Sequence, residues 1–581
     1  MNVRRLPAAV VVFSLPAFPL FAASPDSAAT FTVSSWFQFA SHPYNPSARD
    51  VFEAFQSKSG TSTVASGVSP LRVDAAPAIY PDEFRSLDGR NNAPKDLGAA
   101  GQVNLRNVTV GYADGSGTPA GPLRKSARDV SNIVCAQSAS IVNSQPVSSF
   151  LWNWGNFVDH DMALTRVASP PEDFVIPVPK CDPSFDPRCN GLKTLPFQRA
   201  SYTVVDNVRQ QINANSAFID GSVVYGSDNN RGHALRLEDG TGTGHLATST
   251  GNLMPFNTDS LTNQPARGNP PDFFLGGDVR SNENSALCAM QTLWVREHNF
   301  WADTFANQGL DDDGIYLRAR AIVGAEIQLI TYRDFLPILL GPNALTPYTG
   351  YNQSVDPRVS IAFSAAAFRL GHTFLPSSLM RLNKRGISIG DISLGQSIFA
   401  PNLISAAGIE PFLRGLAKQQ PQEVDAYIIT DIRSFIIQGA TGFDLVALDI
   451  QRGRDVGLPS YNQTRIDYGL APKASFAEMT SDANVQFRLS QAYTSPDDLD
   501  VFIGGLVEDH VNGGQVGELF WTIIKDQFER SRDGDRFWYE TYLDAATLAT
   551  VQAQTLGTII KRNCSIGNEM QDDVFHVPGA H

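Results

Sequence analysis

Basic clusters, long apolar runs and internal repeats are lacking in this sequence of 581 residues, and each absence excludes a class of protein. Lys and Arg number 45 against 59 Asp and Glu, a net charge of −14, without any Lys/Arg-rich run. The electrostatic footprint of a protein that binds nucleic acid or anionic membranes is therefore missing. Beyond residue 23, no stretch reaches the roughly 18 uninterrupted apolar residues of a membrane-spanning helix. No repeat of about 20–50 residues indicates a solenoid or propeller, so we expect small molecules as partners.

Cysteine is also scarce, with five residues in the chain, which excludes a disulfide-rich scaffold. Cys181 and Cys189 close the short loop CDPSFDPRC, and we predict a disulfide between them. The odd number leaves at least one thiol unpaired, and the pairing of Cys135, Cys288 and Cys564 stays open.

The N-terminus has the pattern of a secretory signal peptide at residues 1–23. Arg4 and Arg5 precede an apolar run at 6–21, and small residues follow. A membrane anchor is the alternative, but the run is short and contains three prolines. We therefore predict a secreted or periplasmic protein with no membrane span after signal removal, and a Ser/Ala/Thr-rich N-terminal extension at 24–79.

The remainder, residues 80–575, is predicted to form one large, mainly α-helical domain with long loops and few short strands. Hydrophobic residues make up 42% of the chain, which favours a globular core, and 46 Gly with 36 Pro indicate long connections. Strand-like alternation is sparse, whereas apolar residues recur at helical spacing. The predicted helices are 148–165, 286–307, 313–339, 360–374, 423–438 and 515–530.

The segment SSFLWNWGNFVDHDMALTR combines charged side chains with large apolar ones. On a helix, Asn156, Asp159 and His160 share one face, while Asp161 turns away from His160 by about 100°. A solvated charged triplet at a helix end is one interpretation. The flanking tryptophans favour burial instead, and buried charges need partners or a metal.

The segment NSAFIDGSVVYGS places Ser216, Phe218, Asp220 and Ser222 at alternate positions of a predicted extended loop. Their hydroxyl, carbonyl and carboxylate oxygens are the ligands that Ca²⁺ prefers, and Asp161 could add a remote carboxylate. A polar edge strand would show the same pattern.

Three further pairs of polar residues lie one helical turn apart. Arg280 and Glu283 precede a long apolar helix, Arg369 and His372 lie in an apolar helix, and Asp449 with Arg452 follows an apolar run. Capping and ion pairing would explain the first pair. A buried histidine whose hydrogen bonds are satisfied by its neighbours would explain the second pair. A solvent-exposed cluster of charges would explain the third pair.

Taken in order, these segments resemble the animal-type haem peroxidases of the peroxidase-cyclooxygenase superfamily. The shared motifs are the DHD helix, the NxSxFxDxSxVYGS loop, the RxxE turn, REHN, TYRDFLP, FRxGH, DxQRGRDxGLP and RDGDRFWYE. They extend from about Arg85 to about Asn563, most of the chain.

The resemblance implies a distal histidine, His160, and a distal arginine, Arg280, facing a haem whose iron is bound by His372. It implies that Asn156 lies beside the halide or water site.

It further implies a structural Ca²⁺ held by Asp161 together with Ser216, Phe218, Asp220 and Ser222. The cofactor would be haem b, open to ester links with Asp159 and Glu283. Arg369 and Arg452 would meet the haem propionates or brace the proximal side, and Asp449 would hydrogen-bond to His372.

Three positions depart from the family pattern. Asn156 replaces a Gln, which alters the halide or water site, and Asn284 replaces the Met that forms a sulfonium link in some members. Asp449 replaces an Asn, and a carboxylate there would give His372 imidazolate character and lower the iron reduction potential. We therefore expect a mild oxidant that does not oxidise chloride.

The function implied is reduction of H₂O₂ through a ferryl intermediate, with oxidation of iodide, bromide, thiocyanate or phenols. One alternative is a fatty-acid dioxygenase of the same superfamily, which would need a Tyr where this chain has Arg369. Another is a non-catalytic adhesion or matrix protein on the same scaffold. The presence of His160, Arg280 and His372 together argues against the latter.

Overall fold

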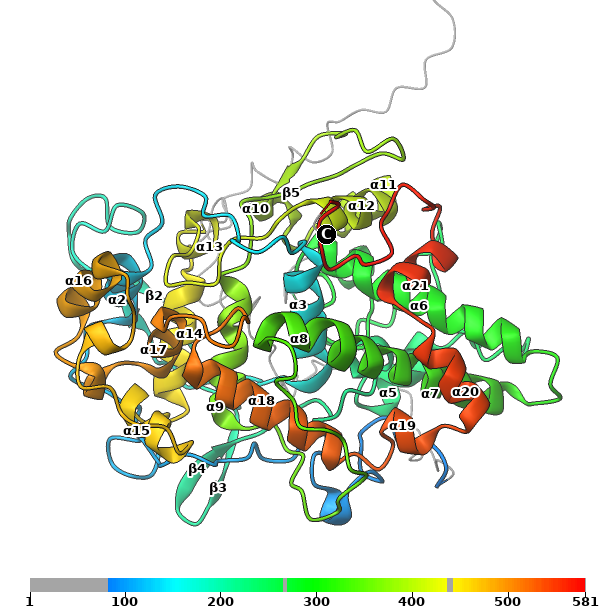
Figure 1. Cartoon of the computed structure of the whole chain (residues 1–581), viewed down its shortest axis with the longest axis horizontal. Coiled ribbons are helices and arrows are strands. Elements are labelled where there is room, and N and C mark those ends of the chain that lie inside the picture. Colours follow the sequence, from blue (N-terminus) through cyan, green and yellow to red (C-terminus); the bar gives the residue numbers. More distant parts are fainter. Residues whose placement is uncertain (1–81, 265–268, 436–441, 580–581) are drawn as a thin grey trace, which may run out of the picture. The chain divides into compact units, whose positions relative to one another are not determined.

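The computed structural model describes residues 82–264, 269–435 and 442–579. The predicted signal peptide at 1–23 and extension at 24–79 lie outside the described residues. The described part is mainly α-helical, as the sequence predicts (Figure 1). None of its helices is long and apolar enough to cross a membrane.

Three long helices form the centre of the core: α3 (Phe150–Met162), α6 (Ser285–Phe305) and α7 (Asp312–Ile330). The side chain of Asn284 caps α6 by accepting a hydrogen bond from the Leu287 N–H. Trp154 and Phe157 of α3 pack against Trp294 of α6, with ring centroids 5.9 and 6.0 Å apart. This aromatic contact fixes α3 against α6 and thereby positions the DHD sequence at the end of α3.

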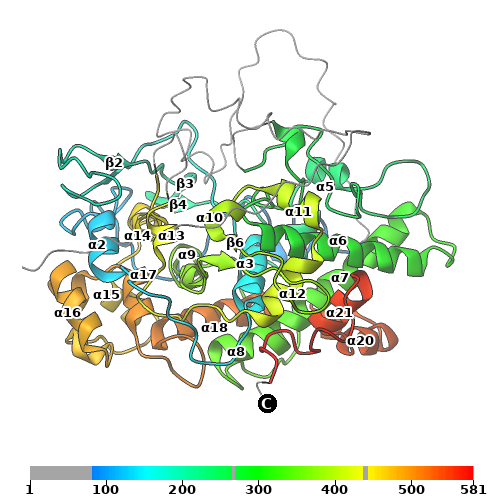
Figure 2. The same cartoon turned by 90° about the horizontal axis from the view of Figure 1, so that it is seen from above.

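The predicted helix 360–374 is interrupted. It consists of α9 (Ile361–Ala365) and a 3₁₀ helix, η6 (Ala367–His372), which meet at Ala366 with the non-helical angles φ −140° and ψ −69°. Next to it lies α14 (Leu445–Asp455), and α9 lies between α3 and α14 (Figure 2).

The strands pair into three separate two-stranded antiparallel sheets, in agreement with the predicted fold class. They are β1 (Ile176–Pro177) with β2 (Thr194–Leu195), β3 (Tyr202–Val205) with β4 (Val208–Gln211), and β5 (Ser378–Leu379) with β6 (Ile392–Ser393). The β3–β4 hairpin projects from the helices (Figure 1).

The remaining helices complete the described part. They are η3 (Pro94–Asp96), α2 (Ala127–Val134), α4 (Ser222–Tyr225), α5 (Asn229–Leu235), η4 (Pro270–Asp272), η5 (Thr331–Phe335), α8 (Leu336–Leu340), α10 (Leu394–Ser397), α11 (Pro401–Ala407), α12 (Glu410–Lys418), α13 (Thr430–Arg433), α15 (Tyr461–Asp467), η7 (Phe476–Glu478), α16 (Ala483–Ala492), η8 (Pro496–Asp498), α17 (Val501–Val507), α18 (Glu518–Asp533), α19 (Tyr539–Tyr542), α20 (Ala545–Gln552) and α21 (Leu556–Asn563).

The predicted helix 423–438 is wrong in its described part. Only the short α13 is helical, while Ile428 and Gln422 form isolated bridges to Ala136 and Val142. Val424, Ala426 and Ile428 are buried at alternate positions, which is the period of an extended chain. Residues 436–438 lie outside the described part.

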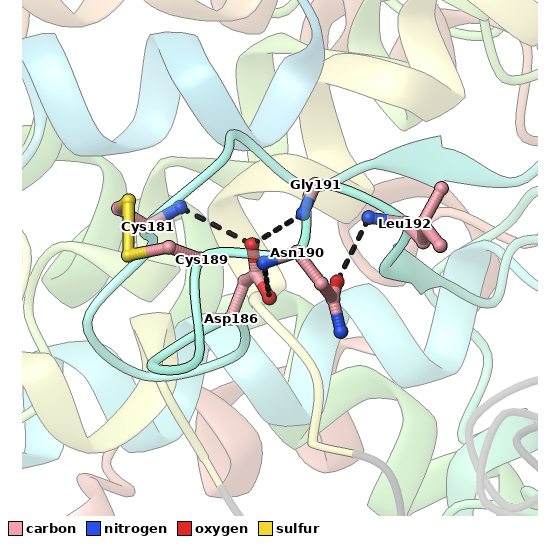
Figure 3. Close-up of a disulfide and its surroundings, with 6 residues drawn as sticks. All are labelled: Cys181, Asp186, Cys189, Asn190, Gly191 and Leu192. Atoms are coloured by element: carbon pink, nitrogen blue, oxygen red, sulfur yellow. Dashed lines mark hydrogen bonds between the residues drawn. A yellow bond between two sulfur atoms is a disulfide. The ribbon is translucent and has the colours of Figure 1, made fainter.

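The predicted disulfide between Cys181 and Cys189 is confirmed (Figure 3). The buried Asp186 organises this loop by accepting hydrogen bonds from the N–H groups of Cys181, Asn190 and Gly191. Cys135, Cys288 and Cys564 are free thiols.

Candidate active site

A cavity of about 220 Å³ lies between α3, the turn before α6, η6 and α14. Eight side chains singled out in the sequence line it: Asn156, Asp159, His160, Arg280, Glu283, Arg369, His372 and Arg452. They come from segments as much as about 300 residues apart, so the fold brings the separate motifs to one place. Much of the remaining lining is apolar and aromatic, including Phe335, Phe368 and Leu448.

His160 lies near the end of α3 and is buried, with 2% of its surface exposed. Its Nε2 lies 3.1 Å from Glu283 Oε2 and 3.3 Å from Asn156 Nδ2. Its Nδ1 lies 3.8 Å from Asp278 Oδ1. Asn215 fixes the end of α3 by donating a hydrogen bond of 2.7 Å to the carbonyl of His160. The imidazole is therefore held on both sides, with Nε2 toward the polar wall of the cavity.

Arg280 is held in place by a carboxylate that the sequence reasoning missed. Asp278 accepts hydrogen bonds from Arg280 Nε at 2.7 Å and from Nη2 at 2.9 Å, while Nη2 also donates to the Ala163 carbonyl. Burial would raise the pKa of Asp278, but the charge and hydrogen bonds of Arg280, with His160 nearby, hold it well below its usual range. Asn215 donates to the same carboxylate at 3.1 Å. Asp278 and Asn215 thus join α3 to the turn that carries Arg280.

The carboxylates of Asp159 and Glu283 line the cavity and remain partly exposed, at 30% and 31%. Asp159 Oδ2 lies 3.3 Å from Arg280 Nη1. Burial raises the pKa of Glu283, but the hydrogen bond and charge of His160 outweigh burial, so the pKa lies below its ordinary value. Both groups are accessible to a molecule in the cavity.

His372 ends η6 on another wall of the cavity. Its Nδ1 lies 2.6 Å from Asp449 Oδ2, and Arg369 Nη1 donates to the other oxygen of Asp449 at 2.7 Å. Burial lowers the pKa of His372, but the charge and hydrogen bond of Asp449 prevail and raise it. Since Nδ1 is engaged by Asp449, Nε2 is the nitrogen left for a ligand.

Arg452, on α14, is nearly fully buried beside the Phe197 ring, 4.4 Å from its centroid. Its Nη1 donates to Asp455 Oδ2 at 2.7 Å. Burial, only partly offset by Asp455, lowers the pKa of Arg452 to about 10. Arg369 and Arg452 thus bring two guanidinium groups, each paired with an aspartate, to the lining of the cavity.

Asp161 turns away from the cavity, as its position on α3 predicts, and meets the loop that carries Asp220. Its carboxylate accepts hydrogen bonds from the N–H groups of Asp220, Gly221 and Val223, at 2.8–3.2 Å. Burial and the neighbouring Asp220 carboxylate raise the pKa of Asp161. Among the described residues, neither carboxylate forms an ion pair with a cationic side chain.

The predicted loop residues gather around Asp220. Ser216 Oγ donates to Asp220 Oδ2 at 2.8 Å, and Ser222 Oγ donates to Oδ1 at 2.5 Å. One expectation is corrected: Ser222 begins helix α4 and does not continue an extended segment, because the left-handed Gly221 (φ 78°) turns the chain. The Phe218 side chain is fully buried.

The residues present fit a haem with one protein ligand and, behind it, a Ca²⁺. His372 presents a single nitrogen to a cavity with apolar walls and two guanidinium groups in its lining, which suits a macrocycle that carries acidic substituents. Asp161 and Asp220 form a buried, like-charged oxygen cluster, which a hard cation would neutralise. The described residues contain no group of three or more His, Cys, Asp or Glu placed to hold a metal ion.

Of the polar contacts, the sequence reasoning missed Asp278 and Asn215. The only available signal for Asp278 is its position two residues before Arg280, from which a short side chain can cap its own turn. Asn215 lies inside the NSAFIDGS motif, but nothing in its spacing indicates a contact with α3.

Comparison with known proteins agrees with this geometry. The sequence model of the animal haem peroxidase family matches residues 84–575. Peroxinectin A of Dictyostelium discoideum is 36% identical over 513 residues, covering 85% of this chain and 96% of the relative. Myeloperoxidase of Mus musculus is 35% identical, covering 82% of this chain and 73% of the relative.

Solved structures show the same relation. Peroxidase A of Dictyostelium discoideum superposes with a TM-score of 0.80 at 33% identity, covering 85% of this chain and 99% of the other. The fatty acid α-dioxygenase of Oryza sativa has a TM-score of 0.71 at 20% identity, covering 87% and 89%, and shares the fold. The fold, the ordered motifs and these relatives lead to one conclusion: the chain belongs to the animal haem peroxidase family and is a haem-dependent peroxidase.

Proposed function

We propose that this protein is a secreted or periplasmic haem peroxidase that reduces H₂O₂ and oxidises small donors, namely iodide, bromide, thiocyanate or phenols. The observation that carries the proposal is that His160 and Arg280 line the same cavity as His372. In this assignment residues 1–23 are the signal peptide, 24–79 an extension and 80–575 the peroxidase domain. His372 would hold haem b, which would supply the electrons for cleavage of the O–O bond of the peroxide.

His160 is the proton carrier. Its Nε2 takes the proton of the inner peroxide oxygen and returns it to the outer oxygen, which leaves as water. Asp278, 3.8 Å from Nδ1, stabilises the positive charge on the ring between these two transfers. Before peroxide binds, Glu283 and Asn156 occupy the hydrogen-bonding positions around Nε2.

Arg280 stabilises the negative charge that develops on the peroxide while the O–O bond breaks. Two hydrogen bonds to Asp278 and one to the Ala163 carbonyl hold the guanidinium in place, so little reorganisation is needed at that moment. Because Asp278 is shared between Arg280 and His160, one carboxylate positions both groups.

Arg369 and Arg452 would bind the haem propionates or brace the proximal side, and Asp159 and Glu283 would form ester bonds to the haem. Their partial exposure toward the cavity supports this assignment. An ester at Glu283 would withdraw its carboxylate from His160 Nε2 and leave that nitrogen free for peroxide.

Asp161, Ser216, Asp220, Ser222 and the carbonyl of Phe218 hold a structural Ca²⁺. The buried pair of carboxylates, which has no cationic side-chain partner among the described residues, supports this site. The ion would fix the end of α3 and so aim the imidazole of His160, which is adjacent to Asp161 in the chain.

The proposal is tested by rapid-scan absorption spectroscopy of the haem-loaded protein. One equivalent of H₂O₂ should shift the Soret band, and iodide, bromide or guaiacol should restore the ferric spectrum. His160→Ala should slow the first step by about 10²-fold or more without loss of haem. An unchanged or merely bleached spectrum would refute the assignment of the distal residues.

The same sample separates the alternatives. Oxygen uptake with palmitate would indicate a fatty-acid dioxygenase, for which the shared fold is the only support in this chain. Arg369, at the position where the dioxygenases need a tyrosine, disfavours it. Donor oxidation no faster than that of free haem would indicate an adhesion or matrix protein.

A further inference from the structure

A second, much smaller cavity lies behind the Asp220 loop, away from the active site. Its volume is about 30 Å³, and its walls include Arg85, Asp220, Arg320, Phe537 and Tyr542. This volume holds about two water-sized spheres, so a single small ion fits and a large one does not. One buried arginine, Arg320, and one that is 10% exposed, Arg85, share this small space, and this arrangement needs an explanation.

The guanidinium of Arg85 is held in place, but only part of its hydrogen-bonding capacity is used. Its Nη2 donates to both oxygens of Asp535, at 2.9 and 2.8 Å. The guanidinium lies between the rings of Phe218 and Phe537, 5.2 and 5.1 Å from their centroids. Its Nη1 is buried and has no hydrogen-bond partner among the described residues.

Arg320, on α7, is 4% exposed and carries a charge without a carboxylate partner in the described part of the chain. Its Nη1 and Nη2 donate to the carbonyls of Arg85 and Ser86, at 2.6 and 3.2 Å. Its Nε is buried and has no hydrogen-bond partner within residues 82–264, 269–435 and 442–579. An uncompensated charge of this kind is costly in a protein interior, where buried charges are normally paired.

With Ca²⁺ bound at Asp161 and Asp220, as proposed above, the charges around the cavity leave a positive surplus. Arg85 and Asp535 neutralise each other, and Arg320 remains. Asp220 is the carboxylate that lines the cavity itself, and in the proposed function its charge is neutralised by Ca²⁺. We propose that this cavity is a binding site for one small halide ion, chloride or bromide, held by Arg85 Nη1 and Arg320 Nε.

This site is coupled to the loop 216–222, here called the calcium loop, and this consequence rests on the proposed Ca²⁺ site. Without Ca²⁺, the Asp220 carboxylate repels an anion in the cavity; with Ca²⁺ bound, that repulsion is cancelled. The two ions therefore bind cooperatively, and each raises the affinity for the other by the same factor. Phe218 connects the two sites, because its ring packs on Arg85 and its backbone belongs to the calcium loop.

The direct test is anomalous diffraction from crystals of the haem-loaded protein soaked in bromide. The expected result is one bromide peak between Arg85 and Arg320. An empty cavity, or one that holds only water, would overturn the proposal, and this outcome does not depend on calcium or peroxidase activity.

The solution test compares sodium chloride with sodium gluconate at equal ionic strength, since gluconate is too large for the cavity. Chloride should raise the unfolding temperature by about 2 °C or more and tighten Ca²⁺ binding by about fivefold or more. Arg320→Gln should abolish both effects. The matched control is Arg318→Gln, on the same helix but exposed, which should keep them.

Equal chloride effects in Arg320→Gln and Arg318→Gln would refute the proposal. If Arg320→Gln does not fold, the bromide peak in the unmodified protein decides. If removal of Ca²⁺ by EGTA leaves the unfolding temperature unchanged while bromide still binds, the halide site is supported and the proposed calcium site is refuted.

Discussion

Asp449 combines two interactions that pull in opposite directions. One carboxylate oxygen lies 2.6 Å from His372 Nδ1 and draws its proton, which makes the imidazole a stronger donor to a bound metal. The other accepts a hydrogen bond from Arg369 at 2.7 Å, which offsets part of the negative charge. The tuning of the proposed iron ligand therefore depends on three side chains, not on His372 alone.

Replacement of Asp449 by Asn should raise the Fe(III)/Fe(II) potential, because the neutral amide still accepts from Nδ1 but no longer draws its proton. Spectroelectrochemical titration of the haem-loaded protein measures this. Arg369→Gln should have the opposite effect and lower the potential, because it removes the positive charge that offsets the negative charge of Asp449. A potential that stays constant or falls in Asp449→Asn would disprove this account of the proximal side.

Asp425 is a titratable residue outside the active site. Burial, reinforced by the negative charges of Glu423 and Asp482, raises its pKa to about 7. The folded state therefore binds a proton more tightly than the unfolded state, whose Asp pKa is about 3.9. Protonated Asp425 therefore contributes its whole share of the folding stability below about pH 4, and this contribution is lost as pH rises through 7.

Asp425→Asn should remove this dependence. The amide oxygen can still accept the hydrogen bond from the Tyr427 N–H, which Asp425 receives at 2.7 Å. The free energy of unfolding of the variant should therefore exceed that of the unmodified protein by about 1–3 kcal/mol at pH 8 and by little at pH 4. Denaturant unfolding between pH 4 and 8 gives this difference, and a gap that does not widen with pH would argue against a raised pKa.

At the scale of elements, the end of α3 is fixed by two carboxylates with different tasks. Asp161 binds three N–H groups of the 220–223 segment, whereas Asp159 faces the cavity. They lie two residues apart on one helix, so the same Asp→Asn change at each gives a matched pair.

Asp161→Asn should lower the free energy of unfolding by about 1–3 kcal/mol and abolish the further loss that EGTA causes. Asp159→Asn should leave the EGTA response intact and instead weaken retention of haem on the chain in acidified organic solvent. Calorimetry with and without EGTA, together with solvent extraction of the chromophore, measures both. If the two variants behave alike, the separation of the calcium and haem roles is wrong.

Local periodicity predicted the long helices but failed at 423–438, where buried residues alternate along an extended chain. The aromatic and apolar residues of α3 and α6 specify these helices, and the helical spacing of His160 with Asn156 brings both to one cavity. The break at Ala366 was not predictable, because alanine favours a helix and only tertiary packing imposes the 3₁₀ turn. The contact of Asp278 with His160 joins residues 118 positions apart, which no local pattern records.

At the scale of the whole molecule, the first described residues are packed against the last third of the chain. Arg85 pairs with Asp535, and Arg536 donates to the carbonyls of Asp82 and Asn91. Tyr542 donates to the Glu83 carbonyl. The single large domain expected at 80–575 thus has its two ends joined by contacts about 450 residues apart in sequence.

These contacts predict where the N-terminus can be shortened. A chain that begins at residue 80 keeps Arg85 and should unfold in one calorimetric transition at the temperature of the full-length protein. A chain that begins at residue 93 loses Arg85 and leaves Asp535, 1% exposed, as an unpaired buried charge. Loss of this ion pair should lower the free energy of unfolding by about 3–5 kcal/mol.

Asp535→Asn in the chain that begins at residue 93 should restore part of this loss, because it removes the buried charge that has no partner. The same substitution in the chain that begins at residue 80 should instead destabilise, since it breaks the ion pair from the other side. This opposite response separates an electrostatic cause from a simple loss of packing around Phe84. If Asp535→Asn destabilises both chains equally, packing and not the ion pair joins the two ends.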